Sequence, residues 1–152
     1  MPRAKTKLKP AAVLFLVAIA VVAYWLDQRR GAADDGTVGS GSIGNAAIGQ
    51  AFEERRSGVW VTGEGEIVHL LPDDRRPPRH QLFLVELTQG HTIKISHNVD
   101  LAPQVPVQKG SRISFRGRFE FNDKGGVVHW THRDPSGRKP GGWLEYLGKT
   151  YK

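Results

Sequence analysis

The chain has 152 residues, with 22 Lys and Arg against 15 Asp and Glu, a formal charge of +7 at pH 7. Four of the cations, Arg3, Lys5, Lys7 and Lys9, lie in the first ten residues, so residues 27–152 carry 18 basic against 15 acidic side chains. The high isoelectric point is therefore a property of the N-terminus and is weak evidence for a nucleic-acid surface. The absence of cysteine excludes disulfides, thiolate metal sites and a cysteine nucleophile.

Residues 11–26 contain no charged side chain and predict a transmembrane anchor. As a helix they would span about 24 Å, against a bilayer core of about 30 Å, and Arg29 and Arg30 can reach the interface. The basic residues 1–10 predict a cytoplasmic tail and an inner-membrane protein whose C-terminal domain faces the periplasm. A cleaved signal peptide, and hence a secreted protein, is the alternative, although small residues come only at 31–33, behind two arginines.

Residues 27–45 predict a flexible linker, because this stretch is rich in Gly, Ser and Asp. Apolar residues followed by a charged run predict a short helix near 45–56, which Gly58 would end. The folded domain is predicted over residues 46–152, enough for one small core and too short for a two-domain enzyme.

Alternating apolar and polar residues predict five strands and a further short strand near the C-terminus. These lie at 59–71, 80–88, 91–97, 111–121, 127–131 and 143–146. Gly63 and Gly65 in the long first strand predict the sharp coil of a small barrel. Five strands, with one helical turn between the third and fourth, predict an all-β, OB-like barrel preceded by the short helix. A β-sandwich is the alternative, disfavoured because it usually has about seven strands.

The second and third strands form a predicted hairpin whose apolar faces must match. Pairing Leu87 with Ile93 does so and leaves a three-residue loop at 89–91. The same register sets His80 opposite Asp100, a candidate catalytic pair in which the carboxylate orients an imidazole base. No nucleophile accompanies them, since no serine lies in a Gly-x-Ser-x-Gly setting. A structural His–Asp pair at a strand edge is the simpler interpretation.

The six histidines raise the hypothesis of a metal site, because His is the commonest metal ligand in proteins. His97, His132 and Asp134 lie at strand ends, where they could hold a divalent metal with an open position for water. His129 and His132 face the same side only if the strand ends near Trp130. The alternative is structural: His97 caps the core by hydrogen bonding and Asp134 forms an Asx turn.

Basic side chains on the third and fourth strands are candidate ligand-binding residues for an anionic partner. They are Lys94, Arg112, Arg116 and Arg118. Such a stripe suits phosphates or anionic lipid headgroups, and an ordinary solvated strand face is the alternative. OB barrels often bind single strands by stacking bases on aromatic side chains of the second and third strands. The predicted outer face of these two strands carries no aromatic side chain. Trp60, Trp130 and Trp143 are predicted in the core.

Four short motifs carry a family resemblance. They are Leu-Pro-Asp-Asp at 71–74, Arg-His-Gln at 79–81, His-Asn-Val-Asp-Leu-Ala-Pro at 97–103 and His-Trp-Thr-His-Arg-Asp-Pro at 129–135. In this order they resemble the bacterial domain of unknown function 3465 over roughly residues 45–152. The resemblance implies a small exported or membrane-anchored bacterial protein and implies no activity. The chain has Lys139 where a His is expected after Arg138, so a metal role for that His would not apply.

Two functions follow as hypotheses. The first is an envelope-anchored binding module, held in the inner membrane through residues 11–26, for an anionic or polymeric ligand such as nucleic acid, glycan or a lipid headgroup. The alternative is a metal-dependent hydrolase or nuclease that uses His97, His132 and Asp134.

Overall fold

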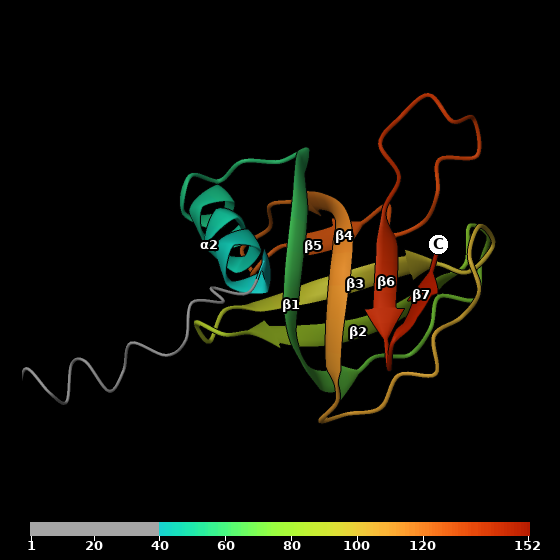
Figure 1. Cartoon of the computed structure of the whole chain (residues 1–152), viewed down its shortest axis with the longest axis horizontal. Coiled ribbons are helices and arrows are strands. Elements are labelled where there is room, and N and C mark those ends of the chain that lie inside the picture. The colour runs from blue at the N-terminus through green and yellow to red at the C-terminus, as the bar shows by residue number, and fades with distance from the viewer. Residues whose placement is uncertain (1–39) are drawn as a thin grey trace, which may run out of the picture. The chain divides into compact units, whose positions relative to one another are not determined.

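The computed structural model describes residues 40–152, which contain one helix and seven strands (Figure 1). The elements are α2 (Ser40–Glu53), β1 (Val59–Leu70), β2 (His80–Leu87), β3 (Thr92–Asn98), β4 (Arg112–Glu120), β5 (Val127–His129), β6 (Trp143–Tyr146) and β7 (Lys149–Tyr151). The predicted anchor at 11–26 and the tail before it lie outside the described residues. Within residues 40–152, no helix has the length and apolar character that crossing a membrane requires.

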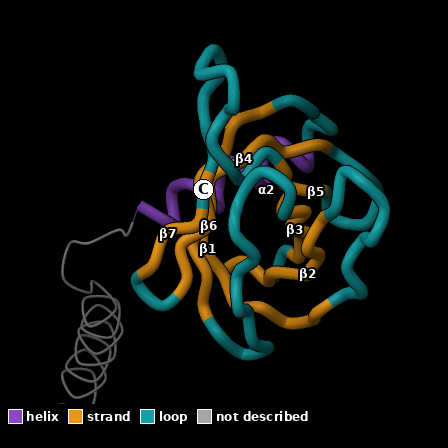
Figure 2. The backbone as a smooth tube through the Cα atoms, turned by 90° about the vertical axis from the view of Figure 1, so that its right-hand side faces the viewer, coloured by secondary structure: helices purple, strands orange, loops and turns teal. Residues whose placement is uncertain are grey.

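The first five strands close into a barrel (Figure 2). The strand order is β1-β2-β3-β5-β4, and β4 pairs back to β1. All pairings are antiparallel except β3 with β5, which is parallel. The hairpin of β6 and β7 extends the sheet beyond β4. The predicted five-stranded barrel with one short helix is confirmed, and β7 is an element that the sequence pattern did not predict.

Strand β1 can pair with both β4 and β2 because glycines let it bend. Residues 59–66 pair with β4 and residues 65–70 pair with β2, so Gly65 lies where the strand changes partner. A Cβ on Gly65 would collide with the carbonyl oxygen of Glu86. The predicted role of glycine in coiling this strand therefore has a steric basis.

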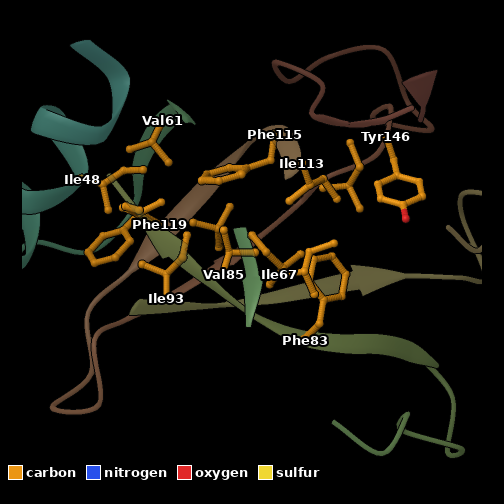
Figure 3. Packing of buried hydrophobic residues seen from close by; sticks show 14 of the residues in the cluster. Ile48, Val61, Ile67, Phe83, Val85, Ile93, Ile113, Phe115, Phe119 and Tyr146 are labelled. Carbon is orange, nitrogen blue, oxygen red and sulfur yellow. The ribbon is translucent and has the colours of Figure 1, made fainter. Parts of the chain in front are cut away.

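The barrel interior is filled by phenylalanine and branched aliphatic side chains, which Figure 3 shows as one continuous layer from Ile48 to Tyr146. Val61 and Leu144 point inward from their strands, so their neighbours Trp60 and Trp143 point outward and are half-buried. The prediction that the tryptophans belong to the core is wrong. The alternation of side chains along a strand decides on which face of the sheet a tryptophan lies, and the size of the side chain does not.

Helix α2 begins at Ser40, five residues before the predicted start. The Asn45 side chain donates to the Glu64 carbonyl (2.8 Å) and accepts from the Glu64 amide (3.1 Å), as a neighbouring strand would. A Cβ on Gly44 would collide with the Thr62 carbonyl oxygen. The glycines that predicted a linker therefore let a helix approach β1 closely.

The helix covers one end of the barrel, next to the β2–β3 hairpin loop. Ile48 and Ala51 are fully buried, and the Asn45 amide also donates to the Thr88 hydroxyl (3.2 Å). Phe52 packs edge-on against His91, with ring centroids 4.6 Å apart. We call this the helix end. The opposite end, where β2 begins and β3 finishes, contains Gln81 and His97 and is called the polar end.

The predicted β2–β3 register is wrong by two residues. Val85, and not Leu87, pairs with Ile93. The Leu87 amide donates to the His91 carbonyl (2.8 Å), the Gly90 amide donates to the Leu87 carbonyl (2.8 Å), and Gly90 has φ +76°. The loop is therefore residues 88–90 with glycine last, where a three-residue hairpin requires the left-handed conformation. A shift of two keeps every side chain on its predicted face.

Candidate functional site

A pocket of about 350 Å³ opens on the outer surface of β2 and β3, towards the polar end of the barrel. Its lining residues are His80, Ser96, Asn98, Leu101, His129, Trp130, His132, Asp134 and Pro135. We call it the histidine pocket. The outward positions of β2 and β3 and the segment that follows β5 build it, so three imidazoles and one indole meet at one site.

The backbone turn at Trp130 creates this gathering. Strand β5 ends at His129, and Trp130 has φ +57°, a conformation that bulky side chains rarely adopt. On a continuing strand His129 and His132 would face opposite sides; after the turn both line the pocket and Thr131 is buried. The sequence allowed His129 and His132 to share a site only if the strand ended near Trp130, and the strand does end there. Strained backbone of this kind is concentrated at functional sites.

Trp130 lies among charged and aromatic groups. Its ring stacks on His132, with centroids 5.6 Å apart and planes at 25°, and meets His129 edge-on at 6.4 Å. The Lys139 Nζ lies 4.8 Å from the indole centroid. Sequence reasoning missed this role because alternation from Val128 points Trp130 inward, and only the turn redirects it.

His132 is held as one tautomer. Its Nδ1 lies 2.7 Å from the carbonyl oxygen of Arg133, which can only accept, so Nδ1 carries the hydrogen. The lone pair then belongs to Nε2. In the neutral ring, Nε2 is therefore the nitrogen that can accept a proton.

His97 differs from His132 because both its nitrogens are engaged. Nε2 donates to the Pro103 carbonyl (3.1 Å), so Nδ1 accepts from the Thr131 hydroxyl (2.8 Å). Burial lowers the pKa of His97, against the opposing effect of the Pro103 carbonyl. The side chain caps the core with no lone pair left for a metal.

Asp134 organises its own loop. Its carboxylate accepts from the Ser136 hydroxyl (2.7 Å) and from the amides of Arg138 and Lys139 (both 2.8 Å). These hydrogen bonds, that of Ser136 first, lower the pKa of Asp134 to about 2. The carboxylate thus has the structural role that the sequence offered as the alternative, through a wider set of bonds than an Asx turn.

The structure does not assemble the predicted metal ligands His97, His132 and Asp134. Among residues 40–152, no three His, Cys, Asp or Glu side chains are grouped so that they could hold a metal ion. The physical reason is that the Asp134 carboxylate and both His97 nitrogens already have partners within the fold.

The predicted catalytic pair is separated by the corrected register. Asn98, and not Asp100, pairs with His80. Asp100 accepts from the backbone amide of Arg79 (2.7 Å) and from its Nε (2.7 Å), and these bonds lower the pKa of Asp100. His80 has no side-chain hydrogen bond to any residue in the described part of the chain. It lines the histidine pocket without the carboxylate orienter that was predicted.

The three β4 arginines are engaged within the domain. Arg112 pairs with Glu64 (3.2 Å), and Arg118 pairs with Glu120 (3.2 Å). Arg116 lies 5.7 Å from the Trp60 ring centroid. Lys94 is on β3, with β5 between it and β4. The three arginines share the outward face of β4, and Lys94 is set apart from them by β5.

A family model described as Protein of unknown function (DUF3465) matches residues 38–152. The chain belongs to this family. No curated protein matches its sequence. In this DUF3465 domain, three of the four motifs that carried the resemblance, at 79–81, 97–103 and 129–135, each contribute residues to the histidine pocket. Segments far apart in the sequence thus converge on one site.

Proposed function

We propose that the domain is an OB-like binding module whose histidine pocket holds one unit of a single-stranded nucleic acid. The observation that carries this proposal is the placement of Trp130. A left-handed backbone turn presents its indole in the pocket, beside two imidazoles and under the Lys139 ammonium. Aromatic rings stack on bases of any sequence, and nearby cations attract the phosphates.

The strand order supports this assignment. The order β1-β2-β3-β5-β4, with β3 parallel to β5, fits an OB-like barrel, and OB barrels bind polymers on the face of strands two and three. The histidine pocket opens on that face. Arg133, Arg138 and Lys139 are exposed on the adjoining loop and supply positive charge that a neutral glycan would not need.

The location remains a proposal from the sequence. An anchor at residues 11–26 would hold the module at the inner membrane with the domain in the periplasm. A metal-dependent hydrolase finds no support, because the described residues offer no three-ligand group.

Fluorescence anisotropy with a labelled single-stranded oligonucleotide of about 12 residues tests the proposal, since an OB fold covers roughly 4–16 nucleotides. We expect binding that weakens with salt. Trp130→Ala should weaken it by about 5- to 100-fold, the value of one stacked base. The matched control is Trp60→Ala, which removes a half-buried indole outside the pocket and should leave the affinity unchanged.

Absence of binding at low salt would exclude the proposal. An equal loss in both tryptophan variants would exclude the pocket as the site. Retention of anionic lipid vesicles or an anionic glycan in place of the oligonucleotide would reassign the ligand.

A further inference from the structure

We propose that the histidine pocket also cleaves RNA without a metal ion, by transferring the phosphodiester to the neighbouring ribose 2′-oxygen. This inference rests on the proposed nucleic-acid binding. It comes from two imidazoles on either side of β3, one with a free lone pair, in a pocket that contains no activated nucleophile of its own.

The two imidazoles line the pocket from chain segments on either side of β3. His80 comes from β2 and His132 follows β5, and β3 lies between these strands, contributing Ser96 and Asn98 to the pocket floor. Adjacent strands are about 4.8 Å apart, so the two backbones are separated by about 10 Å. In this proposal a single phosphate binds between His80 and His132.

His132 supplies the general base. The Arg133 carbonyl fixes the hydrogen on Nδ1, so Nε2 can take the proton of a ribose 2′-hydroxyl. The same contact fixes the ring orientation, as a base that acts on one atom requires.

His80 supplies the general acid. Its side chain lines the pocket and its ring nitrogens have no hydrogen-bond partner among residues 40–152, so both can face a bound substrate. His129 is unsuited to this role because burial lowers its pKa and its Nε2 faces the Glu120 carboxylate at 3.4 Å.

The other lining residues argue against two further hydrolytic mechanisms. Asp134 is the only carboxylate in the lining and its oxygens are engaged by the loop, so the pair of carboxylates that glycoside hydrolysis uses is absent from this pocket. Ser96 has no hydrogen bond to an imidazole of the described chain, as an activated serine would need. The pocket therefore offers no activated side-chain nucleophile, and the RNA 2′-hydroxyl is a nucleophile that the substrate itself supplies.

The reaction balances with these two residues. The 2′-oxygen attacks phosphorus while its proton passes to Nε2 of His132. The bond from phosphorus to the 5′-oxygen breaks, and the 5′-oxygen takes the proton of the His80 imidazolium. The products are a 2′,3′-cyclic phosphate and a 5′-hydroxyl end, with no water, metal or redox partner consumed. Lys139, at the pocket rim, offsets the charge that develops on the phosphoryl oxygens.

The test uses the full chain, with chelator present, and two end-labelled oligonucleotides of about 12 residues. One is DNA with a single ribonucleotide at its centre, and the other is DNA throughout. We expect cleavage only at the ribonucleotide, with the cyclic phosphate identified by mass spectrometry. His80→Ala and His132→Asn should each slow cleavage by about 100-fold or more.

The variants are chosen so that folding is preserved. The Asn side chain at 132 can donate to the Arg133 carbonyl in place of Nδ1 but cannot accept a proton. His69→Ala, which removes an exposed imidazole from β1 outside the pocket, is the matched control and should cleave at the parent rate. Cleavage is compared at protein concentrations that saturate the ribonucleotide strand, so that a slower rate in a pocket variant is not a loss of binding, and His69→Ala should bind the all-DNA strand as the parent does.

Each outcome decides between the two proposals. Binding of both strands without cleavage overturns the inference and leaves the binding module. Failure to bind either strand overturns both. Cleavage that stops with chelator, or that persists in His132→Asn, shows that the two imidazoles do not carry the reaction.

Discussion

The two ends of the barrel are closed by different kinds of interaction. At the helix end, Ile48 and Ala51 are fully buried and exclude water through apolar contact. At the polar end, Gln81 exchanges two hydrogen bonds with the Val105 backbone (2.7 and 3.0 Å), and His97 binds Pro103 and Thr131. Apolar contact fills space without direction, whereas hydrogen bonds fix which atoms meet.

This difference explains why the histidine pocket lies towards the polar end. The His97 side chain holds Thr131, and Thr131 adjoins both Trp130 and His132. The turn that brings the pocket residues together is thus tied to the core by a directed bond. At the helix end the directed bonds are those of the buried Asn45 side chain, and they hold α2 to β1 and to the hairpin loop.

The largest expected effect is at the helix end. Ile48→Ala should lower the free energy of unfolding by about 2–5 kcal/mol, because it removes apolar contacts and leaves a cavity. Ile48→Val, which removes one methylene, should cost about 0.5–1.5 kcal/mol. Urea denaturation measures both. A loss below about 0.5 kcal/mol for the alanine variant would mean that the helix does not close the barrel.

At the polar end, His97→Ala should cost about 3 kcal/mol, because it strands the Thr131 hydroxyl and the Pro103 carbonyl in the interior. His97→Gln can bind both partners and should recover part of the loss. Binding should also suffer in the alanine variant, since Thr131 loses its tether next to Trp130. Unchanged oligonucleotide affinity in a folded His97→Ala protein would contradict the link between this end and the pocket.

Two glycines in the helix sharpen the comparison further. Gly44→Ala should cost about 1–3 kcal/mol by forcing a Cβ against the Thr62 carbonyl. Gly49→Ala, five residues later, meets nothing within 4 Å and should stabilise the domain by about 0.5–1 kcal/mol through helix propensity. Thermal unfolding compares the two. Stabilisation by both would show that the helix can move away from β1 at no cost.

The barrel was predictable because alternation reports burial directly. Ile113, Phe115 and Phe119 are buried where the pattern places them. The hairpin register was not predictable from alternation, since a shift of two residues leaves every side chain on the same face. Only the requirement for glycine at the last loop position distinguishes the two registers. Gly44 was predicted to lie in a linker, because its role in close packing depends on contact with β1, which the local sequence does not reveal.

The candidate site was less predictable, because one backbone angle assembles it. His129 and His132 were expected to share a side only if the chain turned near Trp130. Nothing in the local sequence compels a tryptophan to adopt a positive φ. The turn depends on a long-range partner, His97, which holds Thr131, and on the Asp134 loop that follows.

The smallest effect expected is in the pH dependence of stability, and it separates the two ends most cleanly. Burial, aided by repulsion from His132 and His80, holds the pKa of His97 below its ordinary value near 6.5 in the folded state. The unfolded chain therefore binds a proton first, and stability should fall as the pH decreases below about 6.5 towards the lower folded-state pKa. His129, whose pKa burial also lowers, contributes in the same direction.

Urea denaturation at about pH 7 and about pH 5 measures this fall. His97→Gln should reduce it, because the glutamine does not titrate, whereas Ile48→Val should show the full parental decrease from a lower starting stability. The lowered pKa values of Asp134 and Asp100 do not interfere, since their stabilisation is lost only as the pH falls below about 4. An undiminished decrease in His97→Gln would place the pH sensitivity elsewhere, and His129→Gln would then identify whether the pocket itself carries it.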